Sequence, residues 1–331
     1  DIYFCQMKNG GMAFPQPSAV LQLLKPVTWF PPMWAFACGA VSSGQSLAEN
    51  WLLILSGMLL AGPMVCACSQ AVNDWFDRHV DAINEPQRPI PSGRIPGRWG
   101  LYIAIMWTLL SMLWAWQLGT WAFRATLLAL VLAWAYSAPP FRFKKDGWIG
   151  NAACALSYEG LAWITGAAVM LGGAMPDAHI ITLALLYSLA AHGIMTLNDF
   201  KAIEGDRQMG IWSLPVQLGV KGAAGTACWV MLLPQFVVVA LLLAWGLLPY
   251  AVAVLLLIYA QTPLMMRFMR DPVGRALNLS AFGVPLLVAG MMVSAFAWRN
   301  APQHITTSAA DAVPFLTAQS LQEHSHAKLD L

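Results

Sequence analysis

Charged residues are scarce in this sequence. Asp, Glu, Lys and Arg make up 10% of its 331 residues, whereas roughly 25% is usual for a soluble domain. Hydrophobic residues make up 58%. This balance excludes an ordinary soluble domain and predicts a membrane protein with several spans. The formal net charge of +2 points to no particular partner, so we expect the lipid bilayer as a partner and no nucleic acid.

Cysteine is also scarce, with six residues scattered along the chain. Cys66 and Cys68 share one apolar stretch, and Cys-x-Cys alone is not a zinc pattern. We interpret all six as small apolar packing residues. The first residues lack a charged start, an apolar core and a small-residue cleavage site, so we expect no signal peptide.

Long apolar runs, by contrast, are abundant. A spanning helix needs about 20 mostly apolar residues, and nine segments qualify, although Pro31 and Pro32 interrupt the first. We expect an all-α integral membrane protein with an N-terminal segment (1–17), a nine-helix domain (18–299) and a polar, mobile tail (300–331). The predicted spans are 27–43, 51–72, 99–118, 121–137, 149–170, 178–198, 223–246, 248–268 and 278–298.

Lys and Arg gather on one side of this topology. Fifteen of the eighteen fall in the N-terminal segment or after the second, fourth, sixth and eighth helices, and only Arg124, Arg299 and Lys328 fall on the other side. Cytoplasmic loops carry an excess of Lys and Arg. We therefore expect the N-terminus in the cytoplasm and the C-terminus on the opposite side.

Three aspartates stand at the cytoplasmic end of the second span, in NDWFDRHVDAINEPQRPIPSG (73–93). Asp74, Asp77 and Asp81 are spaced i, i+3, i+7, within roughly 60° of each other on one helix face. Such carboxylates repel unless a cation lies between them, and hard oxygen ligands suit Mg²⁺. A lone aspartate would be a solvated helix end, but three beside a basic loop predict a metal site that includes Asn73.

A second acidic stretch, LNDFKAIEGDRQMGIWSLP (197–215), also opens with Asn-Asp at the end of an even-numbered span. Asp199 and Asp206 are seven residues apart and share a face if the helix continues. Glu204 would point away, unless Gly205 breaks the helix and re-aims it. We expect the two acidic ends to face each other and hold one or more divalent cations, with Asn198 beside them.

Basic residues crowd the same side of the membrane. Arg binds phosphate oxygens through a bidentate fork, and four prolines stiffen the loop that carries Arg88 and Arg94. The alternative is that basic residues only set topology and bind anionic lipid, which we favour for Arg98, Lys221, Arg267, Arg270 and Arg275. We expect a diphosphate to be bound by Asn73, Arg78, Arg88, Arg94, Lys144, Lys145, Asn198, Lys201 and Arg207.

These observations predict a membrane-embedded, Mg²⁺-dependent diphosphate site. An apolar cavity between the helices would suit a diphosphate with an apolar tail, such as a prenyl diphosphate.

The motifs resemble those of the UbiA superfamily of intramembrane prenyltransferases, over about residues 18–297. The first motif, NDxxDxxxD, stands at 73–81, the second is NDFKAIEGD, and YSAPPFRFKKDG (136–147) is also similar. The resemblance implies a nine-helix bundle around a central cavity, with both motifs on cytoplasmic loops and Mg²⁺ as cofactor. Many relatives carry another carboxylate where this chain has Ala202, and Glu204 would compensate for it.

Two longer stretches, DAINEPQRPIPSGRIPG and EGDRQMGIWSLPVQLG, are most similar to the chlorophyll and bacteriochlorophyll synthase branch. That likeness implies a geranylgeranyl or phytyl diphosphate donor and a bacteriochlorophyllide or chlorophyllide acceptor. It also implies a bacterial inner, photosynthetic membrane, with pigment-pathway or photosystem assembly proteins as partners. The nucleophile would be the acceptor's propionate, which is ionised at neutral pH because its pKa is near 4, so no strong base is needed.

Polar residues inside the spans are candidates for the substrate pocket. His192 lies seven residues before Asp199 and could ligate the magnesium of a chlorin, although we favour a hydrogen-bonded interior residue. For Glu159 we leave a substrate contact and a structural pair equally open. Asn151 and Tyr158 are further pocket candidates.

Other function classes predict different patterns. A transporter would place its acidic residues inside the hydrophobic segments, whereas here they cluster at helix ends. A pigment-binding or assembly protein would need no paired carboxylates and no phosphate-binding loop. Within the enzyme class, a quinone or haem prenyltransferase of the same superfamily is the runner-up.

Overall fold

The structure is a computed structural model that describes residues 14–301, and all of its regular elements in that range are helices. The prediction of an all-helical protein is thereby confirmed. The predicted N-terminal segment and polar tail lie largely outside the described residues, so the division into three parts stays a prediction.

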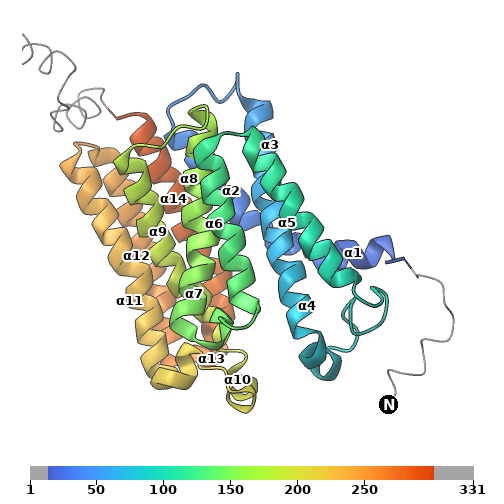
Figure 1. The fold of residues 1–331 in the computed structure, drawn as a ribbon. Helices are drawn as coiled ribbons and strands as arrows, with labels where there is room; N and C mark the ends of the chain where they lie inside the picture. Colours follow the sequence, from blue (N-terminus) through green and yellow to red (C-terminus); the bar gives the residue numbers. More distant parts are fainter. Residues whose placement is uncertain (1–13, 302–331) are drawn as a thin grey trace, which may run out of the picture.

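Nine helical segments of the described chain run alternately up and down one bundle (Figure 1). Three of them are composite, because short π-helical turns join pairs of α-helices. The segments are α2 (Phe30–Ser42), α3 to α4 (Trp51–Asn84), α5 (Trp99–Gln117), α6 (Thr120–Ser137), α7 to α8 (Gly147–Met170), α9 (Ala178–Asp199), α11 (Leu214–Ala244), α12 (Leu248–Arg270) and α13 to α14 (Pro272–Arg299).

Seven of these segments are long and apolar enough to cross a membrane, among the described residues. The two predicted spans that fall short are 27–43 and 121–137. The first is represented by α2, which has only 13 residues because the 3₁₀ turn η2 (Pro26–Thr28) precedes it. The second is α6, which has 18 residues but carries Arg124 near its start. The prediction of a multi-pass membrane protein is confirmed, although only seven spans meet both criteria.

The π-helical turns interrupt three of the long segments. They are η3 (Leu60–Cys66, between α3 and α4), η5 (Leu156–Leu161, between α7 and α8) and η6 (Leu279–Gly283, between α13 and α14). Pro63 lies inside η3, where its missing N–H cannot continue the α-helical pattern. Because π-turns re-aim side chains and occur often at functional sites, η3 and η5 are considered again below.

Small residues let neighbouring helices pack closely. Gly39 of α2 and Gly166 of α8 face each other's helix, and a Cβ at either position would overlap the backbone carbonyl of Trp163 or Phe36. Such small-residue contacts are the usual way for membrane helices to pack. The largest buried cluster joins α2, α8, α9, α11, α12 and α14, and a second joins α1 (Pro17–Leu24) to α4 and α5.

Both acidic stretches lie at the same end of the bundle. Figure 1 shows the end of α4, the start of α7 and the short helix α10 (Ile203–Met209) together at the lower end. The helix α1 lies crosswise beside α4 and α5. Its C-cap, Lys25, has a left-handed backbone conformation with φ of 46°, which is uncommon outside glycine.

Candidate active site

The first acidic motif lies on α4 (Ala67–Asn84), so the predicted helix over the three aspartates is confirmed. Asp74 and Asp81 are buried, with 2% and 7% of their surfaces exposed, and Asp77 is partly exposed. A buried carboxylate is costly unless it is paired and hydrogen-bonded. Each of the three aspartates accordingly has a cationic partner.

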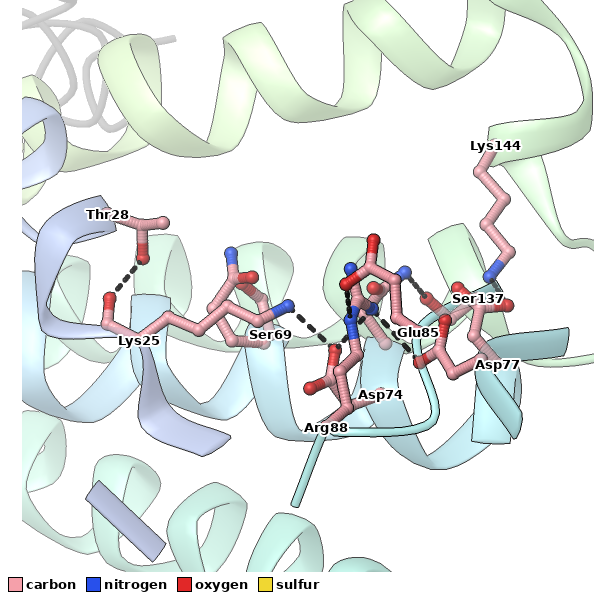
Figure 2. A network of polar contacts seen from close by, with 12 residues as sticks. Lys25, Thr28, Ser69, Asp74, Asp77, Glu85, Arg88, Ser137 and Lys144 are labelled. Atoms are coloured by element: carbon pink, nitrogen blue, oxygen red, sulfur yellow. Dashed lines mark hydrogen bonds and ion pairs between the residues drawn. The ribbon is translucent and has the colours of Figure 1, made fainter. Parts of the chain in front are cut away.

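Lys25 and Arg88 converge on Asp74 (Figure 2). Lys25 Nζ donates to Asp74 Oδ1 at 2.7 Å, and Arg88 Nη1 lies 3.5 Å from the same oxygen. Arg88 also donates to Asp81 at 3.0 Å and to Glu85 at 2.5 Å. Burial acts to lower the pKa of Arg88, but these three carboxylates outweigh it and raise the pKa above its ordinary value.

Asp77 is held by the segment between α6 and α7. Lys144, on the 3₁₀ turn η4 (Phe143–Lys145), donates to Asp77 Oδ1, and Arg142 Nη2 lies 4.0 Å from that oxygen. Burial lowers the pKa of Lys144, although Asp77 opposes the shift. Three segments far apart in the sequence thus supply the cations that neutralise one face of α4.

The other predicted residues of α4 have different partners. Asn73 Nδ2 donates to Ser137 Oγ at 3.3 Å, at the end of α6. Arg78 lies over the Trp75 ring, 4.0 Å from its centroid, and donates to the Trp75 carbonyl at 2.7 Å. Its predicted contact with a diphosphate stays a prediction.

Arg94 and Lys145 do not reach the acidic cluster either. Arg94 donates to the Gln87 carbonyl at 2.6 Å and to Ser92 Oγ at 3.0 Å, so it holds its own loop together. Lys145 is exposed. The predicted diphosphate roles of both residues stay predictions.

The helix of the second acidic stretch does not continue as the i, i+7 spacing required. Instead, α9 ends at Asp199 and α10 begins at Ile203, so the two aspartates lie on different helices. Gly205 does not break the helix, because it lies inside α10 and the interruption comes earlier, at 200–202. The condition for a shared helical face is therefore not met, and the prediction of one face for Asp199 and Asp206 is wrong.

Asp206 of this second stretch is buried, and Asp199 is partly buried. Asp199 Oδ2 accepts from Asn151 Nδ2 at 3.1 Å. Asp206 is 7% exposed, and its burial raises the pKa of its carboxyl. Glu204 is not brought to the pair, because its side chain is 75% exposed beside Arg207 at 3.9 Å. Four predicted residues of this stretch are exposed, namely Asn198, Lys201, Glu204 and Arg207.

The segment before α7 connects the two acidic stretches. The Trp212 N–H donates to the Lys145 carbonyl, and the Gly147 N–H donates back to the Trp212 carbonyl, each at 2.7 Å. The same segment carries Lys144, which binds Asp77. The backbone at 145–147 therefore links the segment that binds Asp77 to the segment that follows Asp206, and the predicted site shared by the two stretches stays a prediction.

The donor set suits a hard divalent cation, although residues 14–301 hold no group of three His, Cys, Asp or Glu arranged to enclose a metal. The carboxylates of the first motif form ion pairs with Lys25, Arg88 and Lys144 instead. Mg²⁺ is commonly held by one or two carboxylates, waters and substrate phosphates rather than by an all-protein cage. The oxygen donors present therefore fit a Mg²⁺ that arrives with a diphosphate.

A cavity of about 200 Å³ opens beside Asn73 and runs into the membrane region. A smaller cavity of about 30 Å³ adjoins it, sharing Pro32, Ala61, Val65, Ala129 and Ser157. The walls come from α2, η3, α4, α6, α7 and η5. They are mainly apolar, and their polar members are Cys66, Ser69, Gln70, Asn73, Tyr136, Cys154, Ser157 and Tyr158.

Of the four predicted pocket residues, Tyr158 lines this cavity. Asn151 binds Asp199 instead. His192 Nε2 lies 3.2 Å from the Trp148 carbonyl, which fits the interior hydrogen bond that we favoured. Glu159 is 4% exposed, and its Oε2 has no hydrogen-bond partner among the described residues.

Sequence reasoning missed two contributors to the site. From the sequence, Lys25 counts only among the basic residues of the N-terminal segment, because nothing in its local sequence indicates a pairing 49 residues away. Gln70 was overlooked inside an apolar run, yet it lies one helical turn before Asp74 on the cavity wall. An isolated polar residue in a span was the available signal for Gln70.

Comparison with known proteins gives consistent results. The model of the UbiA prenyltransferase family matches residues 28–279. The chain is 56% identical over 286 residues to the bacteriochlorophyll synthase 33 kDa chain of Cereibacter sphaeroides, covering 86% of this chain and 94% of the relative. It is 41% identical to the chloroplastic chlorophyll synthase of Avena sativa, covering 84% of this chain and 75% of the relative.

Solved structures share the fold at low sequence identity. A digeranylgeranylglyceryl phosphate synthase structure matches with a TM-score of 0.65 and 22% identity, covering 84% of this chain and 98% of the other. A UbiA homolog from Archaeoglobus fulgidus, bound to GPP and Mg²⁺, matches with a TM-score of 0.58 and 23% identity, covering 85% and 99%.

The family match spans most of the chain. The alignment with the Cereibacter sphaeroides relative covers 86% of this chain and 94% of the relative. Both confirm the predicted resemblance and the predicted enzyme class. The chain therefore belongs to the UbiA prenyltransferase family.

Proposed function

We propose that the protein is a bacteriochlorophyll synthase. It transfers a geranylgeranyl group, with phytyl as the alternative, from its diphosphate to the propionate carboxylate of bacteriochlorophyllide a. The near full-length similarity to a bacteriochlorophyll synthase chain supports the acceptor. The observation that carries the donor is the charge-paired acidic face of α4 at the mouth of an apolar cavity.

Mg²⁺ is the proposed cofactor. Asp74, Asp77 and Asp81 would hold it with Asn73 on one side, and Asp199 and Asp206 would hold it on the other. When bound, it supplies positive charge to the diphosphate and so stabilises this leaving group.

Three basic residues of the chain would bind the diphosphate directly. Lys25, Arg88 and Lys144 are already gathered at the acidic face, each within an ion pair. Positioned cations stabilise charge that develops on a leaving group, most strongly where water is excluded. The cavity walls below them shield the allylic carbon from water, so that the acceptor rather than water attacks it.

Protein groups do not need to remove a proton in this reaction. The propionate is ionised at neutral pH, because carboxyl groups have reference pKa values near 4. One carboxylate oxygen forms a bond to the allylic carbon, the bond from that carbon to the diphosphate oxygen breaks, and its electron pair leaves with the diphosphate.

The proposal includes a topology. All nine helical segments cross a bacterial inner membrane, with the N-terminus and both acidic stretches on the cytoplasmic side. The grouping of both motifs and most basic residues at one end of the bundle supports this orientation. Pigment-pathway or photosystem assembly proteins are the proposed protein partners.

An acceptor panel tests the function. Membranes that contain the protein are supplied with geranylgeranyl diphosphate, Mg²⁺ and one acceptor at pH 7, and products are separated on a reversed-phase column. We expect bacteriochlorophyllide a to be esterified with its absorbance unchanged, and chlorophyllide a to react more weakly. EDTA should stop the reaction and Mg²⁺ should restore it. Prenylation of 4-hydroxybenzoate or haem, with neither chlorophyllide reacting, would establish the runner-up instead.

A further inference from the structure

A hydrogen-bonded pair on the cavity wall is not explained by diphosphate binding. Gln70 Nε2, on α4, donates to the Tyr158 hydroxyl oxygen, on η5, at 2.9 Å. The Cys66 thiol lies 3.4 Å from the same oxygen. Both Gln70 and Tyr158 line the cavity and are partly exposed in it.

The tyrosine hydroxyl has a proton to donate. Gln70 donates to the Tyr158 oxygen, and the Cys66 sulfur, a weak hydrogen-bond partner, lies 3.4 Å from it. A phenol carries one O–H donor as well as acceptor lone pairs, and a glutamine amide carries two N–H donors. The phenolic O–H and the second amide N–H of Gln70 can therefore donate to a ligand in the cavity, since the Cys66 sulfur beside them is only a weak acceptor.

The position of the pair along α4 fits the reacting carbon. Gln70 precedes Asp74 by four residues, which is about 6 Å along the helix axis. It therefore lies one turn deeper in the membrane than the first acidic cluster. In a prenyl diphosphate the attacked carbon is bonded directly to the diphosphate. When the diphosphate is at the cluster, that carbon lies near the level of Gln70 and Tyr158, where the nucleophile must also be.

We propose that Gln70 and Tyr158 bind the carboxylate of the acceptor and hold one of its oxygens against the allylic carbon. This inference rests on the proposed function. An anion in an apolar cavity needs hydrogen bonds to replace those of water. Two neutral donors supply these hydrogen bonds. A cationic side chain would instead form an ion pair with the carboxylate and hold it away from the allylic carbon. Neither donor loses its proton, because the reaction transfers none to or from the protein.

The competing explanation is that the pair only fastens α4 to η5. Binding of two forms of the acceptor separates the explanations. The purified protein in detergent, with Mg²⁺ and the unreactive geranylgeranyl thiolodiphosphate, is titrated with bacteriochlorophyllide a. A second titration uses the same pigment with its propionate methylated, and binding is followed by pigment fluorescence. The wild type should bind the free acid more tightly than the ester.

Two variants carry the test. Tyr158→Phe should remove about 10-fold of the preference for the acid, since a hydrogen bond to a charged group is lost. Gln70→Glu keeps the size of the side chain but repels a carboxylate, so it should weaken acid binding and leave ester binding within about twofold. Thiolodiphosphate binding at the wild-type level in Tyr158→Phe, and ester binding near the wild-type level in Gln70→Glu, should show that both variants fold. Tyr259→Phe, exposed on the outer surface of α12, is the matched control and should change nothing.

The outcomes are distinct. The inference is overturned if both variants keep the wild-type preference for the acid and the KM for the acceptor during turnover is unchanged. The proposed function then still stands. Equal weakening of acid and ester binding also overturns it and leaves the fastening role. A wild-type protein that esterifies no bacteriochlorophyllide refutes the proposed function itself.

Discussion

At the scale of residues, the acidic face of α4 is a balanced set of charges. Asp74, Asp77 and Asp81 would repel each other, and Lys25, Arg88 and Lys144 cancel that repulsion. A diphosphate with Mg²⁺ would offer these carboxylates a cation and these cations an anion. The same side chains can therefore exchange internal ion pairs for contacts with the ligand.

The carboxylates are the first test of this exchange. Asp74→Asn, Asp77→Asn and Asp81→Asn should each lower turnover by about 100-fold or more, because an amide is a weaker ligand and leaves a cation unpaired. Initial rates with bacteriochlorophyllide a and geranylgeranyl diphosphate measure the effect. Membrane insertion should be unchanged.

Glu49→Gln is the matched control, because Glu49 is an exposed carboxylate in the loop at the opposite end of the bundle. Its turnover should equal that of the wild type. Near-normal turnover in all three aspartate variants would rule out the Mg²⁺–diphosphate interpretation.

Arg88 tests the geometry of the positive charge. Arg88→Lys keeps the charge but loses the planar fork that reaches Asp74, Asp81 and Glu85. We expect a loss of about 10-fold or more in kcat/KM with every acceptor, since at least one charged hydrogen bond is lost. Steady-state kinetics with bacteriochlorophyllide a and chlorophyllide a measure it, and Arg98→Lys, at an exposed arginine, is the control. A loss confined to one acceptor would place Arg88 at the acceptor instead.

At the scale of elements, two π-helical turns and several small residues form much of the cavity wall. η3 supplies Ala61, Val65 and Cys66 to its wall, η5 supplies Tyr158, and α6 supplies Ala129. Ala61 and Ala129 line both the large cavity and the smaller one beyond it. A prenyl chain that extends away from the acidic cluster must pass them.

The passage between the two cavities should limit the length of the prenyl chain. Ala129→Phe fills it, so kcat/KM for geranylgeranyl diphosphate should fall about 10-fold or more relative to that for geranyl diphosphate. Rates with the two donors measure the ratio. Leu128→Phe, one residue earlier on the outward, exposed side of α6, should leave the ratio unchanged. An unchanged ratio in Ala129→Phe would mean that the chain leaves the cavity by another route.

What could be predicted at this scale follows from local patterns. Apolar runs located the long helices, and the spacing of Asp74, Asp77 and Asp81 established their shared face, because both depend on one helix. The break between Asp199 and Asp206 was misplaced, since a glycine permits a turn without requiring one. The Lys25 ion pair and the close packing of Gly39 on α8 depend on contacts distant in sequence, so no local pattern could reveal them.

At the scale of the whole molecule, the acidic stretches and the segments that supply their cations lie at one end of the bundle. These segments include the loop with Arg88 and the one with Lys144. The loop 43–50, between α2 and α3, lies at the other end. An excess of Lys and Arg marks the cytoplasmic side, where a water-soluble diphosphate would also be released. The site and the topology signal thus share one face.

This shared face leads to a labelling prediction. Gln87 and Glu49 are exposed positions at opposite ends of the bundle. A cysteine placed at Gln87 should react with a membrane-impermeant thiol reagent only in inside-out vesicles, whereas one at Glu49 should react only in right-side-out vesicles. The parent protein measures background labelling, because Cys154 is only partly buried and Cys5 lies outside the described residues, whereas Cys38, Cys66, Cys68 and Cys228 are buried. Labelling of both positions from the same face would contradict a membrane crossing by the segment between them. If each position reacts only from the face opposite to that expected, the diphosphate site lies outside the cytoplasm.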